Sequence, residues 1–94
     1  MSEINGALSG LKIVACSTAQ AGTVPYMLMA DLGAEVIKIE TPGKGDNNRN
    51  SGFLEGEIGS FFETNNRGVK SLTLNLKSEN GQKILHNLIK DADV

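Results

Sequence analysis

The sequence predicts an α/β fold, in which the strands of Rossmann-like βαβ units form a parallel sheet. Two short aliphatic runs, residues 11–15 and 35–40, are separated by a segment that carries helix-starting and helix-ending signals. Strand, helix and strand within about thirty residues is the spacing of a right-handed crossover between parallel strands. A chain of 94 residues has room for one such domain.

The first strand is expected at residues 11–15, which read Leu-Lys-Ile-Val-Ala. This run is β-branched and aliphatic, and it lies between Gly10 and the small-residue segment 17–22, as is typical of a buried strand. Residues 1–9 are mostly polar or small and predict a loose lead-in.

A helix is expected from Thr23 to Gly33. Thr23 can cap its start, and Pro25 falls in the first turn, where a missing N–H costs little. Gly33 is a natural stop at the C-terminal end. The second strand, residues 35–40, follows after a very short turn, so it should lie parallel to the first.

Residues 41–51 collect Gly, Pro, Asn and Asp, and they predict an exposed loop. Within it, Lys44 and Arg49 flank flexible backbone that could surround a phosphate. The Walker spacing is absent, so a solvated turn is the stronger interpretation. A short helical turn is expected at 58–64 and a further turn at 65–68.

The third strand is expected at residues 70–76, because apolar and polar residues alternate there. Ser78 can then cap a helix that runs to about Asp91, with one apolar stripe lying on the sheet. The stripe consists of Ile84, Leu85, Leu88 and Ile89. Val94 should open another strand, so we expect the sheet to be incomplete at its carboxyl end and the chain to be truncated there.

The composition argues against several classes of protein. Nine Lys and Arg against eleven Asp and Glu do not fit a general nucleic-acid binder. Cys16 is the only cysteine, so no intrachain disulfide can form and a reducing, cytoplasmic setting is expected. No segment approaches the roughly 20 apolar residues that cross a bilayer, so no membrane partner is expected.

Single reactive residues give weak signals. Cys16 could be a nucleophile, but the only histidine, His86, is on the second helix, so a packing thiol is the preferred interpretation. His86 has no second His or Cys to complete a metal site, so we expect a surface histidine and no bound metal. Asp31 and Glu35 are separated by the helix stop at Gly33 and do not form an acid–base pair.

A dinucleotide site is the obvious alternative for a βαβ start. Glu40 ends the second strand, where an acidic residue holds a ribose hydroxyl in such folds. The turn after the first strand, however, has one glycine, Gly22, where the fingerprint needs three. That turn still lies at the carboxyl end of a parallel strand, where Gln20 either meets a ligand or merely solvates a loop.

Several motifs occur in a fixed order along nearly the entire chain. They lie at residues 8–14, 21–22, 29–40, 45–49, 66–72, 74–81 and 91–94. The most specific is 29–40, Met-Ala-Asp-Leu-Gly-Ala-Glu-Val-Ile-Lys-Ile-Glu. Together they resemble the opening of the class III CoA-transferases, the family of formyl-CoA transferase, carnitine CoA-transferase and α-methylacyl-CoA racemase.

The resemblance implies that CoA moves from an acyl-CoA to a free carboxylate through an aspartyl-CoA thioester, which is covalent carboxylate catalysis. Acyl-CoA and carboxylates would be substrates, with no covalently bound cofactor. None of the four aspartates of the chain, Asp31, Asp46, Asp91 and Asp93, matches the catalytic aspartate of the family. The nucleophile would therefore lie outside this chain, and these 94 residues alone should be inactive.

The resemblance also assigns residues to the CoA site. They are Thr18, Ala19, Gln20, Ala21, Leu74 and Lys77. Gln20 would hydrogen-bond acyl or carboxylate oxygens during catalysis, and Lys77 would neutralise phosphate charge. The chain departs from the family at Thr41, where some members carry a basic residue, and at Pro25, which comes later than the usual proline.

The resemblance further implies that residues 1–94 are the amino-terminal part of a large CoA-binding domain in an interlocked homodimer. Two alternatives stay open. An acyl-CoA racemase of the same family would share every motif here. A stand-alone nucleotide- or anion-binding βαβ module would require the chain to end naturally at Val94 and to fold alone.

Overall fold

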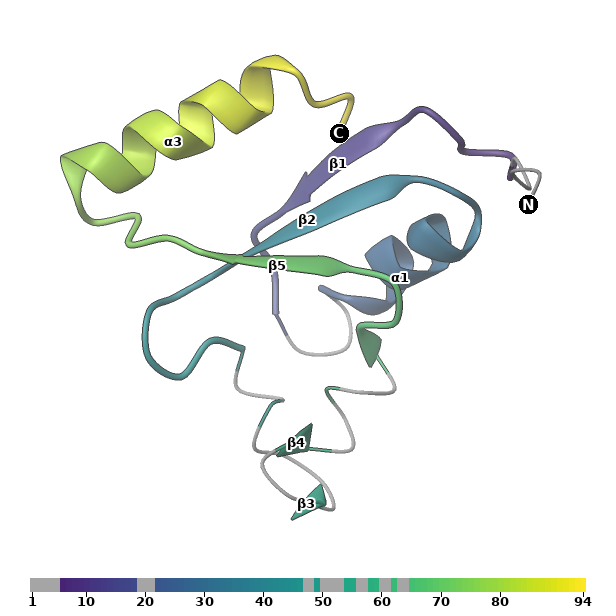
Figure 1. Cartoon of the computed structure of the whole chain (residues 1–94), viewed down its shortest axis with the longest axis horizontal. Coiled ribbons are helices and arrows are strands. Elements are labelled where there is room, and N and C mark those ends of the chain that lie inside the picture. The colour runs from purple at the N-terminus through teal and green to yellow at the C-terminus, as the bar shows by residue number, and fades with distance from the viewer. Residues whose placement is uncertain are drawn as a thin grey trace.

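A parallel sheet of three strands is the centre of the fold (Figure 1). The computed structural model describes residues 6–18, 22–46, 49, 54–55, 58–59, 62 and 65–94. The sheet strands are β1 (Lys12–Ala15), β2 (Glu35–Glu40) and β5 (Lys70–Thr73), in the order β1-β2-β5. The helices are α1 (Val24–Asp31) and α3 (Glu79–Lys90), and a separate two-stranded sheet joins β3 (Leu54–Glu55) to β4 (Ile58–Gly59).

Both strand pairings in the main sheet are parallel, which confirms the α/β prediction. Ile13 of β1 lies opposite Val36 of β2, and Ile39 of β2 lies opposite Leu72 of β5. Because side chains alternate along a strand, this register places Ile13 and Val36 on the same face of the sheet.

The hydrophobic core lies on that face, beneath α1. Its buried members are Ile13, Ala15, Ala34 and Val36. Tyr26, Met29 and Ala30 of the α1 segment pack against them. The opposite face is covered less completely: Ile84 and Leu88 of α3 share a cavity with Val14 and Ile37.

The start of α1 differs in one detail from the prediction. The Thr23 backbone has φ −120° and ψ −37°, away from the extended conformation of a capping residue, and its side chain makes no cap hydrogen bond. Its carbonyl oxygen nevertheless accepts the Met27 N–H at 2.9 Å, so the helix does begin there. Gly33, with φ +105°, follows the helix as predicted.

Strand β5 is shorter than the predicted 70–76, because the chain turns after Leu74. The Leu74 N–H donates to the Glu40 carbonyl oxygen at 3.0 Å, one residue past the strand. Ser78 then caps α3 as expected, and its Oγ accepts the Gly81 N–H at 3.0 Å.

The helical turn predicted at 58–64 is wrong at its start. Residues 58–59 form β4 and pair antiparallel with residues 54–55. The backbone groups of this segment therefore find their hydrogen-bond partners in a neighbouring strand and not within a helical turn. Phe62 alone of the described residues in the range 60–64 is helical.

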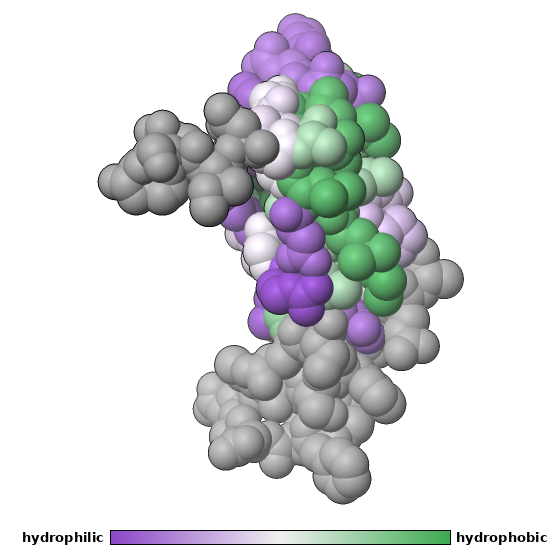
Figure 2. Space-filling view, turned by 90° about the vertical axis from the view of Figure 1, so that its right-hand side faces the viewer, coloured by the Kyte–Doolittle hydropathy of each residue, from purple (hydrophilic) through white to green (hydrophobic). Residues whose placement is uncertain are grey.

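The apolar stripe of α3 lies on the sheet only in part. Leu85 and Leu88 are half-buried, whereas Ile84 and Ile89 are 45% and 51% exposed. Figure 2 shows a band of apolar side chains on the face of the molecule that it presents. Among the described residues, no helix is long and apolar enough to cross a membrane.

Residues 93–94 lie along the free edge of β1. The Asp93 N–H donates to the Lys12 carbonyl oxygen at 2.8 Å, and the Val14 N–H donates to the Val94 carbonyl oxygen at 2.9 Å. The connection through α3 therefore returns to the far side of β1 (Figure 1), so the strand order reverses there. In open α/β sheets, ligands bind near such a reversal, at the carboxyl ends of the strands.

Gly81 provides a test of the α3 packing. A Cβ at this position would lie 2.0 Å from the Asn75 carbonyl oxygen, which is far too close for two non-bonded atoms. Gly81→Ala should therefore destabilise the protein by about 1–3 kcal/mol, although alanine favours helix elsewhere. Urea unfolding measures the change. The exposed neighbour provides the control, Asn80→Ala, which should stay within about 0.5 kcal/mol; an unchanged or higher midpoint for Gly81→Ala would contradict the packing.

Candidate functional site

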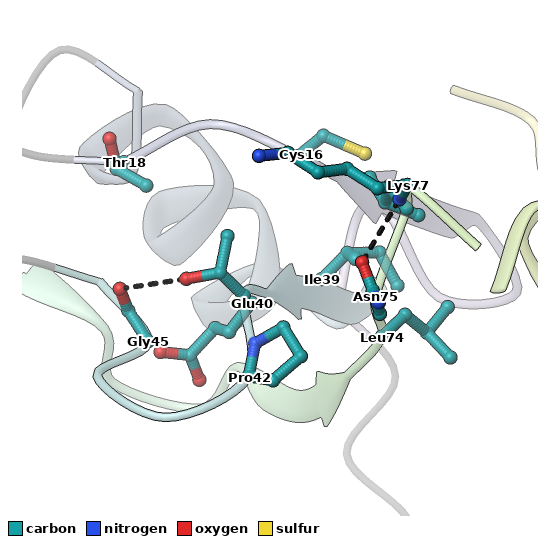
Figure 3. Close-up of a pocket in the computed structure, with 11 residues that line it drawn as sticks. Cys16, Thr18, Ile39, Glu40, Pro42, Gly45, Leu74, Asn75 and Lys77 are labelled. Atoms are coloured by element: carbon teal, nitrogen blue, oxygen red, sulfur yellow. Dashed lines mark hydrogen bonds between the residues drawn. The ribbon is translucent and has the colours of Figure 1, made fainter.

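A cavity of about 520 Å³ lies where the three parallel strands end (Figure 3). The residues that line it follow β1, β2 and β5 in the chain or form their last positions. They are Cys16, Thr18, Ile39, Glu40, Thr41, Pro42, Gly45, Leu74, Asn75, Leu76 and Lys77. The carboxyl edge of the sheet is thus hollowed at the place that the topology favours for a ligand.

Three of the six residues that the sequence assigned to CoA binding line this one cavity. Thr18 comes from the segment after β1, and Leu74 and Lys77 come from the segment after β5. The other three, Ala19, Gln20 and Ala21, lie outside the described residues. Fold topology therefore brings together residues that are more than fifty positions apart in the sequence.

A tight turn after β5 fixes the backbone at Lys77. The Asn75 side-chain oxygen accepts the Lys77 N–H at 3.1 Å, and the Ser78 hydroxyl donates to the Asn75 carbonyl oxygen at 2.9 Å. The Lys77 side chain is exposed, and it forms no ion pair within the part of the chain that the structure describes. Its ammonium group is the cation at the rim of the cavity (Figure 3).

Cys16 is exposed and lines the cavity, so the packing-thiol interpretation was wrong. The physical reason is that β1 ends at Ala15, and Cys16 lies just past the last residue that the sheet buries. His86 is exposed on α3, as predicted. No group of three or more His, Cys, Asp or Glu side chains that could hold a metal occurs among the described residues.

The Glu40 carboxylate is the most connected group beside the cavity. Arg49 donates to it twice, from Nε to Oε1 at 2.8 Å and from Nη2 to Oε2 at 2.7 Å. The Asp46 N–H donates to Oε1 at 2.9 Å, and the Ser71 hydroxyl donates to Oε2. Each oxygen therefore accepts two hydrogen bonds, and the side chain is only 2% exposed.

This arrangement holds Glu40 ionised. The Arg49 guanidinium lowers the pKa of Glu40 to about 2, against the opposing effect of burial, with smaller contributions from Ser71 and the Asp46 N–H. The same bond raises the pKa of Arg49. A carboxylate offers about four lone-pair sites, and all are occupied, so Glu40 has none left for a ribose hydroxyl. The geometry thus agrees with the glycine count in opposing a dinucleotide site.

A second ion pair, Lys38 with Asp46, lies next to the first and is buried. The Lys38 ammonium donates to the Asp46 carboxylate and, at 2.8 Å, to the Asn66 side-chain oxygen. The Phe62 ring lies beside both cations, with its centroid 5.3 Å from Lys38 Nζ and 3.9 Å from Arg49 Cζ. Lys38 and Asp46 are almost completely buried, at 2% and 0% exposed. We call Lys38, Glu40, Asp46 and Arg49 the charge cluster.

The charge cluster corrects the prediction for residues 41–51. Residues 41–44 are exposed, as expected of a loop, but Asp46 is buried and Arg49 is half-buried. Arg49 is committed to Glu40 and is not free to hold a phosphate. Lys44 is exposed and lines a separate cavity of about 190 Å³.

Sequence reasoning missed the charge cluster, although a signal existed. Lys38 and Glu40 alternate with Ile37 and Ile39, so they share the core face of the strand with Val36. Two charges on the buried face of a strand are costly unless each has a partner. Residues of opposite charge, Asp46 and Arg49, occur a few positions later in the loop, and this pattern indicates two ion pairs between the strand and the loop.

Known proteins resemble nearly the whole chain. The family model described as CoA-transferase family III matches residues 8–94. An acyl-CoA transferase of Fusarium pseudograminearum is 40% identical over 102 residues, which cover 99% of this chain and 22% of that protein. The succinyl-CoA:glutarate CoA-transferase of Homo sapiens is 40% identical over 89 residues, covering 93% of this chain and 20% of that protein.

Solved structures give the same result. A CaiB/BaiF family protein from Brucella suis superposes with a TM-score of 0.87 at 37% identity, over 96% of this chain and 25% of that one. The chain thus spans about a fifth to a quarter of the length of the relatives that it matches.

The pKa of Glu40 predicts how stability depends on pH. Because the folded pKa, about 2, is below the ordinary 4.5, the ionised side chain contributes up to about 3 kcal/mol above pH 4.5, and this is lost as the pH falls toward 2. The full-length protein and its Glu40→Gln variant should therefore differ most in urea midpoint at neutral pH. The difference should shrink progressively below pH 4.5.

The control for this pH series is Glu79→Gln, because Glu79 is exposed on α3. It should alter the free energy of unfolding at neutral pH by less than about 0.5 kcal/mol. A Glu40→Gln difference that stayed constant from pH 7 to pH 2 would show that the ionised carboxylate contributes nothing to stability.

Proposed function

The chain belongs to CoA-transferase family III, and from this premise we propose that its protein moves CoA from an acyl-CoA to a free carboxylate. The observation that carries the proposal is the cavity at the carboxyl edge of the sheet, which gathers Thr18, Leu74 and Lys77. Relatives of about the same identity are named as CoA-transferases for oxalate and for glutarate, which supports transfer to a carboxylate.

The nucleotide part of CoA fits the side of the cavity that follows β5. Ile39, Pro42 and Leu74 give this cavity apolar walls that suit a flat base. Lys77 places a flexible ammonium at the rim, where it can meet a phosphate. We infer that Leu74 contacts the base or ribose and that Lys77 neutralises phosphate charge.

The thioester end of CoA would lie at residues 18–21. Gln20 then donates its amide N–H to the carbonyl oxygen on which negative charge develops during acyl transfer. The attacking carboxylate belongs to an aspartate outside this chain. Asp46 is unsuited to the task because it is completely buried and paired with Lys38.

The proposed reaction proceeds in balanced steps. The aspartate carboxylate attacks the thioester carbonyl carbon, the C–S bond breaks, and CoA leaves as a thiolate with a mixed anhydride behind it. The thiolate attacks the aspartyl carbonyl carbon of the anhydride, which releases the first carboxylate and forms the aspartyl-CoA thioester. The acceptor carboxylate then attacks the aspartyl-CoA thioester and releases the CoA thiolate, which leaves a second mixed anhydride. The thiolate attacks the acceptor carbonyl carbon of this anhydride, which forms the new acyl-CoA and frees the aspartate carboxylate.

We further propose that residues 1–94 belong to a larger CoA-binding domain, that the protein is an interlocked homodimer, and that it works in the cytoplasm. The alternative, an acyl-CoA racemase of the same family, shares these motifs but does not transfer CoA between carboxylates. An assay of exchange separates it from a transferase.

A transfer assay tests the proposal directly. The full-length protein is incubated with succinyl-CoA or acetyl-CoA and with isotope-labelled glutarate, oxalate or succinate. A transferase should yield labelled acyl-CoA, detected by mass spectrometry. In a parallel reaction with an α-methyl-branched acyl-CoA in D2O, replacement of the α-proton by deuterium without acyl exchange would indicate a racemase. CoA binding without either reaction would indicate a binding module.

Lys77 gives a second prediction, for affinity. Lys77→Gln should raise the dissociation constant for CoA about tenfold, because a charge-assisted contact to phosphate is lost. Calorimetry measures it, and the wild-type advantage should shrink with added salt. Lys83→Gln on α3 is the matched control and should bind CoA normally; equal affinities of the wild type and Lys77→Gln would remove Lys77 from the site.

A further inference from the structure

One wall of the cavity is a loop without regular structure. Thr41, Pro42 and Gly45 line the cavity from residues 41–46, and Pro42 and Gly45 lie across from Lys77 (Figure 3). Gly43 has φ +88° and Gly45 has φ +66°, conformations that glycine adopts without strain. A glycine-rich segment of this kind would sample many conformations unless side chains held it, and each ordered residue costs conformational entropy.

Asp46 fixes the far end of this loop through three separate groups. Its N–H donates to Glu40 Oε1 at 2.9 Å, and its carbonyl oxygen accepts the Arg49 N–H at 3.0 Å. Its carboxylate accepts from the buried Lys38 ammonium. The loop therefore leaves β2 at Glu40 and returns to the Glu40 side chain within six residues.

Arg49 completes the closure from outside. Its two bonds to Glu40 orient both carboxylate oxygens, and Oε1 is then shared with the Asp46 N–H. A Cβ at Gly45 would lie 2.6 Å from Glu40 Oε1 and 3.1 Å from Arg49 Nε, so the loop backbone lies directly against this pair. Arg49 itself is not among the residues that line the cavity.

We propose that Arg49 is a positioning residue for CoA. Through its bidentate bond to Glu40, it holds residues 41–46 in the conformation that forms the cavity wall, and so it sets the affinity for CoA. This inference rests on the proposed function. If the wall is already ordered before CoA binds, binding does not have to offset the conformational entropy that ordering the loop would lose. A small displacement of a positioned group can lower a rate or an affinity by a large factor.

Charge and geometry can be separated experimentally. Removing Arg49 would also leave Glu40 with an unpaired negative charge near the cavity, which would repel phosphates. Arg49→Lys keeps the positive charge but cannot make two parallel bonds to one carboxylate. A loss of affinity in Arg49→Lys would therefore report geometry rather than charge.

Arg67 provides a matched control. Its guanidinium also binds a carboxylate through two bonds, to Asp31 at 3.0 and 2.5 Å, but on the exposed surface beside α1. Neither Arg67 nor Asp31 lines the cavity. Arg67→Lys and Arg67→Ala remove the same kind of contact without reaching the loop.

The test uses steady-state transfer kinetics and CoA calorimetry on the full-length protein. Arg49→Lys should raise the KM for acyl-CoA and the dissociation constant for CoA about fivefold, and Arg49→Ala more than tenfold. The value of kcat and the KM for the carboxylate acceptor should stay within about twofold of the wild type. The Arg67 variants should match the wild type in all four quantities.

Other outcomes would overturn the inference. A lower kcat with an unchanged KM for acyl-CoA would show that Arg49 only keeps the protein folded. A KM for acyl-CoA in Arg49→Lys equal to that of the wild type would show that the charge of residue 49, and not its two parallel bonds, sets the affinity. If Arg49→Ala fails to fold, Arg49→Lys decides. If the wild type transfers and binds CoA but the Arg49 variants do so equally well, only this inference fails. A wild type that neither binds CoA nor transfers it overturns the proposed function, and the inference with it.

Discussion

Two opposite-charge pairs, side by side at the end of β2, are the constraint on which the site depends. Lys38 and Glu40 point to the core face of a strand, where a lone charge would be strongly disfavoured. Their partners, Asp46 and Arg49, come from the segment that follows the strand. The need to neutralise the strand therefore dictates where the loop goes, and Phe62 closes the cluster against both cations.

The cavity follows from this constraint and from the strand order. Because β1, β2 and β5 are parallel, the residues after them meet at one edge, and the neutralised cluster gives that edge a fixed wall. The family resemblance placed Thr18, Leu74 and Lys77 in one site, which the topology also brings together. The resemblance did not predict the charge cluster, because Glu40 and Arg49 become partners only when the loop folds back onto the end of β2.

The sequence predicts the elements whose signals are local. The strands follow from runs of aliphatic residues, and the ends of the helices follow from Gly33 and Ser78, whose effects act within one turn. The failures concern position relative to the rest of the chain. The sequence predicts Asp46 in an exposed loop, but it is buried and paired with Lys38. It predicts Cys16 as a packing residue, but Cys16 is exposed and follows the last residue of β1. Periodicity carries no information on such pairings.

The spacing of the two ion pairs has an evolutionary consequence. Lys38 and Asp46 are eight positions apart, and Glu40 and Arg49 are nine. A recombination crossover inside this stretch joins the strand end of one parent to the loop of another, and it leaves a buried charge without its partner wherever the two parents differ at one of these pairs. The segment from β2 to Arg49 should therefore be kept together when chimeras are built, and suitable junctions lie outside it.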